Sequence, residues 1–133
     1  MYLFINTAEQ NRITVGLIES DFLFDKIIEP CQWQESEKLV PLINRVIKKN
    51  KLTLKKLKGI IVVKGPGGFT SLRIGVITAN TLSYSLKIPV VGVRLGQGMI
   101  KQGIKRIKKL RSFRIIEPHY GRPPNITKPK KNK

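Results

Sequence analysis

An almost entirely apolar run, Gly59–Val63, is followed by the loop "KGPGG" and then by a long helical pattern. A run without polar alternation is typical of a strand that is buried on both faces. Such strands occur in α/β sheets, where helices cover the strands from both sides. Because strand, glycine loop and helix is also an order that holds phosphate, the loop is either a phosphate site or a structural turn.

Further strands and helices are predicted by hydrophobic periodicity on both sides of this loop. The predicted strands are Tyr2–Asn6, Arg12–Ile18, Phe22–Ile28 and Pro89–Val93, and the predicted helices are Ser36–Lys49, with Ser36 as its N-cap, and a second one from Thr70 or Ser71 to Leu86. Three strands, helix, strand, helix, strand is the order of a ribonuclease-H-like lobe. The order alone leaves this as one option among several α/β folds.

The second predicted helix is apolar on more than one side. Gly75, Ala79 and Ser83 recur every four residues and form a groove of small side chains. The groove is either ordinary core packing or a surface where a second helix approaches closely. The glycine and the alanine favour the helix–helix interface.

The charge is distributed unevenly along a chain of 133 residues whose formal net charge is +18. Residues 1–43 carry three bases and seven acids, whereas residues 44–133 carry 23 bases and one acid, Glu117. This asymmetry predicts either an acidic partner such as RNA or only a solvated surface. One cysteine, Cys31, excludes an internal disulfide and favours the cytoplasm. No run reaches the ~20 apolar residues of a membrane span, and no signal peptide is expected.

Four motifs resemble the TsaB (YeaZ) family and occur in the family's order. Residues 65–93, "GPGGFTSLRIGVITANTLSYSLKIPVVGV", resemble its GPGSFTGLRIG signature and the helix and strand that follow. The segment "SEKLVPLI" resembles its H-S-E-x-L-L-P-L-I helix, "INTA" stands where the family has I-D-T-S, and "EPHYGRPP" resembles its closing P-x-Y-x-R-P-P. The resemblance implies an α/β fold, namely a single ribonuclease-H-like lobe of the actin/Hsp70/sugar-kinase superfamily with a mixed five-stranded sheet and flanking helices.

This resemblance divides the chain into three parts. Residues 1–93 correspond to the ribonuclease-H-like N-terminal lobe. Residues 94–116 stand where most of a second lobe would be and read as a short basic helix and one strand, and residues 117–133 hold the closing motif and a basic tail that is expected to be disordered.

Departures from the family pattern argue against catalysis. Asn6 stands where the family has an acid, so it cannot supply the negative charge that a hard cation prefers. Glu35 replaces a His, and Gly68 and Ser71 replace Ser and Gly. The loop lacks the Gly-Lys-Ser/Thr ending of a P-loop. Ser71 has no base nearby in the sequence, and His119 with Cys31 is too few ligands for zinc.

The resemblance therefore implies a non-catalytic subunit without cofactor or metal. In the family, the two helices pack against the catalytic subunit TsaD, and the complex modifies tRNA with a threonylcarbamoyl group. The implied partners are a TsaD-like subunit, a TsaE-like ATPase, tRNA through the complex, and a second copy of the chain when TsaD is absent; no membrane is implied. The alternative is a standalone basic RNA-binding protein.

Three groups of residues are predicted to carry these functions. The structural glycine loop comprises Gly65, Pro66, Gly67, Gly68, Phe69 and Thr70, with Phe69 anchored in the core and Thr70 starting the helix. The partner interface comprises Leu39, Ile43, Val46, Leu72, Ile74, Gly75, Ala79 and Leu82. The predicted tRNA contacts are Lys101, Lys105, Arg106, Lys108, Lys109, Arg111, Lys128, Lys130, Lys131 and Lys133.

Overall fold

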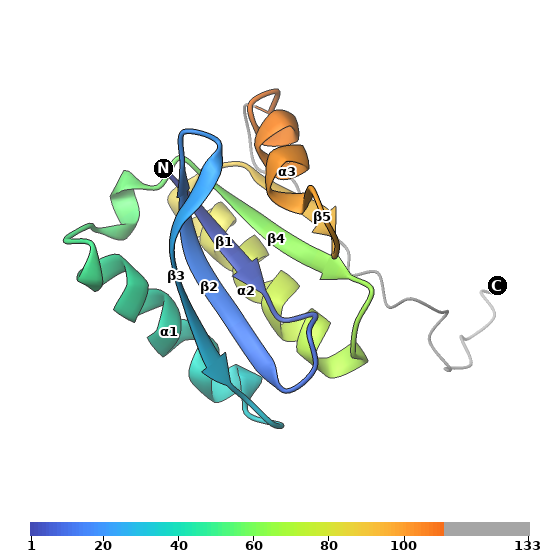
Figure 1. Ribbon diagram of the computed structural model, residues 1–133. Helices are drawn as coiled ribbons and strands as arrows, with labels where there is room; N and C mark the ends of the chain where they lie inside the picture. Colours follow the sequence, from blue (N-terminus) through green and yellow to red (C-terminus); the bar gives the residue numbers. More distant parts are fainter. Residues whose placement is uncertain (111–133) are drawn as a thin grey trace, which may run out of the picture.

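A mixed five-stranded sheet forms the centre of the computed structural model, which describes residues 1–110 (Figure 1). Its strands are β1 (Tyr2–Asn6), β2 (Arg12–Glu19), β3 (Phe22–Pro30), β4 (Gly59–Gly65) and β5 (Val90–Arg94). They lie in the order β3-β2-β1-β4-β5, with antiparallel pairing among the first three and parallel pairing of β1 with β4 and of β4 with β5. The predicted α/β class and sheet are thus confirmed.

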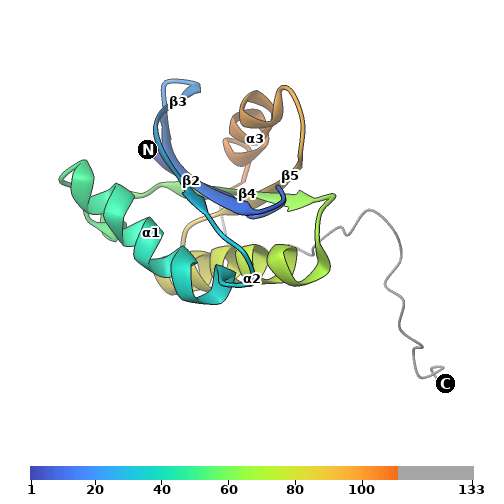
Figure 2. The same ribbon diagram turned by 60° about the horizontal axis from the view of Figure 1, so that its bottom comes forward.

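Helices cover both faces of this sheet. The helices are α1 (Glu35–Lys49), α2 (Phe69–Leu86), α3 (Met99–Ile107) and the short 3₁₀ helix η1 (Leu54–Lys56). Figure 2 shows α1 and α2 side by side on one face and α3 on the other. Two cores result: one lies between the sheet and α1 and α2, and the other lies under α3. This arrangement explains why β4 has no polar alternation, since both of its faces are buried.

The first helix carries an apolar stripe at helical spacing. Its inward residues are all buried against the sheet: Leu39, Leu42, Ile43, Val46 and Ile47. Pro41 lies inside α1 at an exposed position, and the helix continues through it. The prediction of Ser36 as the N-cap is wrong, because the helix begins at Glu35 and its N-cap residue, Gln34, makes no side-chain cap.

The short basic helix predicted within residues 94–116 is confirmed as α3, and it packs closely on β4. A Cβ atom at Gly103 would lie 2.6 Å from Cγ2 of Ile61, and one at Gly59 would lie 2.5 Å from Cδ1 of Ile107. The helix α3 packs on the sheet that residues 1–93 form, and its side chains share one apolar core with that sheet. The packing is therefore continuous across residue 93. The predicted strand after α3 and the closing motif lie outside the described residues. Within residues 1–110, no helix is long and apolar enough to cross a membrane.

Candidate functional site

The glycine loop lies against the residues that follow β1. Gly65 ends β4 with a φ of +129°, a backbone angle that L side chains rarely adopt. A Cβ atom at Gly67 would lie 2.7 Å from the carbonyl oxygen of Ala8, so glycine lets the two backbones approach each other. Gly68 has no such contact, since a Cβ atom at this position would have Oγ of Ser71 as its nearest neighbour, at 3.9 Å. The close contact of the loop is therefore structural and is made by Gly67.

Two predictions about this loop are wrong. Phe69 does not anchor the loop in the core, because its side chain is 42% exposed and its ring lies 5.4 Å from the guanidinium carbon of Arg73. Thr70 does not start the helix either. The helix α2 begins at Phe69 after Gly68, which is its N-cap residue, and no side chain caps it.

A short chain of hydrogen bonds joins the starts of both helices to the end of β1. The hydroxyl of Thr7 donates to the carbonyl oxygen of Ser71 at 2.7 Å. The hydroxyl of Ser71 donates in turn to Oε2 of Glu35 at 2.8 Å. Glu35 and Ser71 are two of the departures from the family pattern, and they contact each other. The replacement of a His by Glu35 is thus matched by a hydroxyl donor on α2.

A cavity of about 400 Å³ opens beside this chain of bonds. Its lining residues are Thr7, Ala8, Glu9, Gln10, Asn11, Cys31, Gln32, Trp33, Glu35, Gly67, Gly68 and Ser71. The lining includes two carboxylates and no lysine or arginine, so a phosphate would meet like charge there. Glu9 also accepts a hydrogen bond from Nε of Arg12 at 2.9 Å. The electrostatics of this cavity disfavour nucleotide binding.

Asn6, which stands where the family has an acidic residue, makes a structural hydrogen bond. Its side chain is 3% exposed, and its Oδ1 accepts a hydrogen bond from the backbone N–H of Ala8 at 2.9 Å. This contact fixes the turn after β1 instead of presenting an oxygen to a ligand. No cluster of three His, Cys, Asp or Glu side chains suited to a metal ion occurs in the described part of the chain.

The residues predicted to form the partner interface face inward. Leu39, Ile43, Val46, Leu72, Gly75 and Ala79 are buried within this chain, while Ile74 and Leu82 are partly buried against the same core. A Cβ atom at Gly75 would collide with Oγ1 of Thr7, so the glycine makes room for the residue after β1 and not for a partner. The hydroxyl of Ser83 donates to the carbonyl oxygen of Ile88. The prediction that this groove faces a helix of a partner is wrong, because its small residues bring α2 close to the sheet of the same chain.

A different side of α2 is exposed, and sequence reasoning did not select it. Four residues spaced four, four and seven apart form what we call the outer stripe: Phe69, Arg73, Ile77 and Tyr84. Ile77 is 53% exposed and Tyr84 is 69% exposed. Val40 on α1 is also 52% exposed. The helical spacing of these residues was the available signal, but the sequence alone did not show which side of α2 the sheet covers.

The predicted tRNA contacts on α3 occupy different places. Lys101 lies in the first turn of α3, whereas Lys105, Lys108 and Lys109 lie at its other end. Arg106 is already engaged, since its Nη1 donates to the carbonyl oxygen of Gly92 at 2.5 Å. Nζ of Lys108 lies 3.5 Å from Oδ1 of Asp21. Arg111, Lys128, Lys130, Lys131 and Lys133 lie outside the described residues.

Known proteins with similar sequences support one family. A family model described as "TsaD: tRNA N6-adenosine threonylcarbamoyltransferase" matches residues 29–111, which is more than half of the chain. The chain belongs to this family, in its TsaB (YeaZ) group. TsaB of Buchnera aphidicola subsp. Schizaphis graminum is 37% identical over 81 residues, which are 61% of this chain and 39% of that protein. TsaB of Bacillus subtilis is 32% identical over 79 residues, or 59% of this chain and 34% of that protein.

A solved structure gives the same fold. YeaZ from Pseudomonas aeruginosa superimposes with a TM-score of 0.65 at 22% identity, over 70% of this chain and 43% of that one. The predicted ribonuclease-H-like architecture is thus confirmed as that of YeaZ. This chain spans about two fifths of the length of the TsaB relatives from the two Buchnera strains, namely 39% and 43%.

Proposed function

We propose that this chain is a non-catalytic subunit in tRNA threonylcarbamoyladenosine biosynthesis and pairs through α2 with a TsaD-like subunit. The observation that carries the proposal is the outer stripe. Exposed apolar side chains at helical spacing on a helix whose opposite side is buried are typical of a helix that packs against a partner. The names of the TsaB relatives supply the process, and the description of the matching family model supplies the partner class.

The non-catalytic role rests on the end of the sheet beside the glycine loop. The cavity there is lined by two carboxylates and by no lysine or arginine. The side chain of Asn6 accepts a hydrogen bond within the turn after β1. A site of this composition does not neutralise the charge of phosphate groups, and Asn6 does not offer a carboxylate to a hard cation. We therefore expect the isolated chain not to hydrolyse ATP or cleave peptides or RNA.

The other expected partners follow from the same proposal. A TsaE-like ATPase, tRNA bound by the assembled complex, and a homodimer in the absence of TsaD are all part of it, and the cytoplasm is the compartment. The proposal also keeps the division of the chain into an N-terminal lobe (residues 1–93), a shortened remnant of the second lobe (residues 94–116) and a closing segment (residues 117–133). The alternative function, a standalone basic RNA-binding protein, is favoured by the charge of +18.

The decisive experiment mixes the full chain with a TsaD-like subunit from the same organism. We expect a complex by light scattering or analytical ultracentrifugation. The variant Ile77→Glu places a charge in the outer stripe and should weaken the complex at least about tenfold, since ~1.4 kcal/mol corresponds to a factor of ten. Threonylcarbamoylation of tRNA by the mixture should fall in parallel.

A matched control comes from β3, the edge strand farthest from β5 in the sheet. Ile28 on β3 is 45% exposed, close to the 53% of Ile77, so Ile28→Glu makes the same chemical change at similar exposure. This variant should bind the TsaD-like subunit like the unaltered chain. Equal weakening by both variants, or no complex with the unaltered chain, would contradict the proposal. Binding of bare tRNA by a chain that ignores TsaD would support the alternative.

A further inference from the structure

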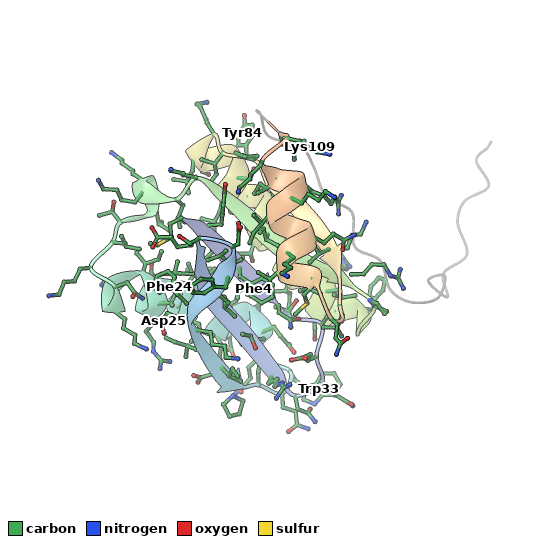
Figure 3. The ribbon with its side chains drawn as sticks, turned by 45° about the horizontal axis from the view of Figure 1, so that its top comes forward. Phe4, Phe24, Asp25, Trp33, Tyr84 and Lys109 are labelled. Carbon is green, nitrogen blue, oxygen red and sulfur yellow. The ribbon has the colours of Figure 1, made fainter. Side chains whose placement is uncertain are left out.

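Three chain segments that are far apart in the sequence meet at one end of the sheet. The parallel strands β1, β4 and β5 begin at this end, and α1, α2 and α3 finish there. Contacts confirm the meeting: Asn50 donates to Oδ2 of Asp25 at 2.8 Å, and Ile107 packs where a Cβ of Gly59 would be. Figure 3 shows Tyr84 and Lys109 at this end and Trp33 at the other.

Lysines are concentrated at this end, which we call the basic end. They come from the segment after α1, from the turn after α2 and from the last part of α3. Its members are Lys48, Lys49, Lys51, Lys55, Lys56, Lys58, Lys87, Lys105, Lys108 and Lys109, all at exposed positions. The six lysines within residues 48–58 were not among the predicted nucleic-acid contacts.

Few of these charges are neutralised by nearby acids. Nζ of Lys49 lies 3.2 Å from Oδ1 of Asp25, and Nζ of Lys108 lies 3.5 Å from Oδ1 of Asp21. The other eight lysines make no ion pair with any residue of the described chain. Exposed like charges at such density repel one another and lower the stability of the fold, so they require a reason.

Helix stabilisation explains only part of the cluster. Lys48, Lys49 and Lys105 lie in the last turns of α1 and α3, where cations interact favourably with the helix dipole. That effect falls off within the last turn. Lys51, Lys55 and Lys56 lie beyond α1, in a turn and in η1, so the dipole of α1 does not account for them.

The opposite end of the sheet differs in charge. The cavity beside the glycine loop presents Glu9 and Glu35 and no base. Lys64, Arg94 and Lys101 also lie toward that end, but the lysines of the described residues are more concentrated at the basic end. A concentration of charge of this kind steers a polyanion to a defined surface.

We propose that the basic end binds the sugar-phosphate backbone of an RNA, with Lys51, Lys55 and Lys56 as phosphate contacts. The choice of RNA among polyanions rests on the proposed function. The contacts are independent of base sequence, since lysine recognises phosphate as a point charge. This surface is separate from the outer stripe of α2 except at the last turn of that helix, so RNA and a protein partner can bind together.

The test compares two triple variants of the full chain that remove the same charge. One is Lys51→Gln/Lys55→Gln/Lys56→Gln at the basic end. The control is Lys38→Gln/Lys64→Gln/Arg94→Gln, whose residues lie near the start of α1 and at the carboxyl ends of β4 and β5. Both keep the basic residues beyond 110, so any contribution from those residues is common to all three proteins. Thermal unfolding establishes that each variant is folded.

The measurement is the affinity for an unmodified tRNA transcript between about 50 and 200 mM salt. Each lost phosphate contact lowers the slope of log affinity against log salt by about 0.7–0.9, so the basic-end variant should lose about two to three units. Its affinity at low salt should fall about tenfold or more, while the control stays within about twofold to threefold of the unaltered chain.

Several results would overturn this inference. Equal losses in both variants would mean that only net charge matters, and an unchanged slope would mean that the lysines are only solvated. Binding to phosphatidylserine vesicles that the basic-end variant abolishes, with tRNA affinity unaffected, would assign the surface to a membrane instead. Binding to the TsaD-like subunit is measured separately with the same variants, so failure of RNA binding is distinguishable from failure of the proposed function.

Discussion

The two sides of α2 differ in a way that reverses the expected roles of their residues. The inner side carries Gly75, Ala79 and Ser83, which are buried against the sheet. The outer stripe carries larger side chains and is exposed, with Ile77 at 53%. Small residues allow close approach, and here the partner they approach is the sheet of the same chain. A small-residue groove therefore identifies a close contact without saying whether that contact is internal or external.

The largest effect is expected from one substitution made on each side of this helix. Ala79→Trp places a large ring where the exposed fraction is 0%, and overpacking of this kind should lower the free energy of unfolding by about 3 kcal/mol. Ile77→Trp places the same ring on the outer stripe and should change stability by less than about 0.5 kcal/mol. Urea unfolding of both variants measures the difference.

This pair of variants can also overturn the comparison itself. If Ala79→Trp folds as stably as the unaltered chain and loses only partner binding, the small residues face a partner after all. If Ile77→Trp is strongly destabilised, the outer stripe is covered in the isolated chain. Either result would reverse the assignment of the two sides.

A smaller effect is expected from the two glycines that precede α2. Gly67→Ser would place Cβ 2.7 Å from the backbone oxygen of Ala8, which cannot rotate away, so we expect a loss of about 2 kcal/mol. Gly68→Ser has room, and serine is a favoured N-cap residue, so this variant should be neutral or slightly more stable. Thermal unfolding measures both, and equal losses would show that the loop does not rest on the end of β1.

The smallest effect concerns α1, which adds polar contacts to its apolar packing. The hydrogen bond from Asn50 lowers the pKa of Asp25 below its ordinary value of 3.8, and Lys49 contributes to the same shift. Since the folded-state pKa is depressed, the carboxylate stabilises the fold above about pH 4. This contribution is lost as the pH falls through the folded-state pKa.

Asp25→Asn should therefore lower the melting temperature slightly at about pH 7 and leave it nearly unchanged at about pH 2, so that the melting temperature depends less on pH between about 5 and 2. Asn50→Ala removes the main cause of the shift and should flatten the same profile. If Asp25→Asn keeps the full acid dependence of the unaltered chain, another carboxylate is responsible and the tie between α1 and β3 is weaker than the geometry indicates.

Much of the fold could be predicted because local patterns and burial agree. Short apolar runs, alternating or continuous, predict all five described strands to within about two residues, and hydrophobic periodicity predicts α1 to within about one residue. Residue types at the glycine loop were also informative, since Gly65 and Gly67 are required by a backbone angle and a close contact. Helix starts were less predictable, because Glu35 and Phe69 begin their helices without side-chain caps.

The sequence by itself determined the α/β class, the order of the elements and the excess of positive charge, since these depend on composition and periodicity. Only the tertiary structure decided which side of α2 is covered, because a helix with apolar residues on several sides has no single preferred direction. Only the tertiary structure brought Glu35 to Ser71 and gathered the lysines after α1 at the same end as those of α3. Parallel strands with returning helices place helix ends together, whatever their separation in the chain.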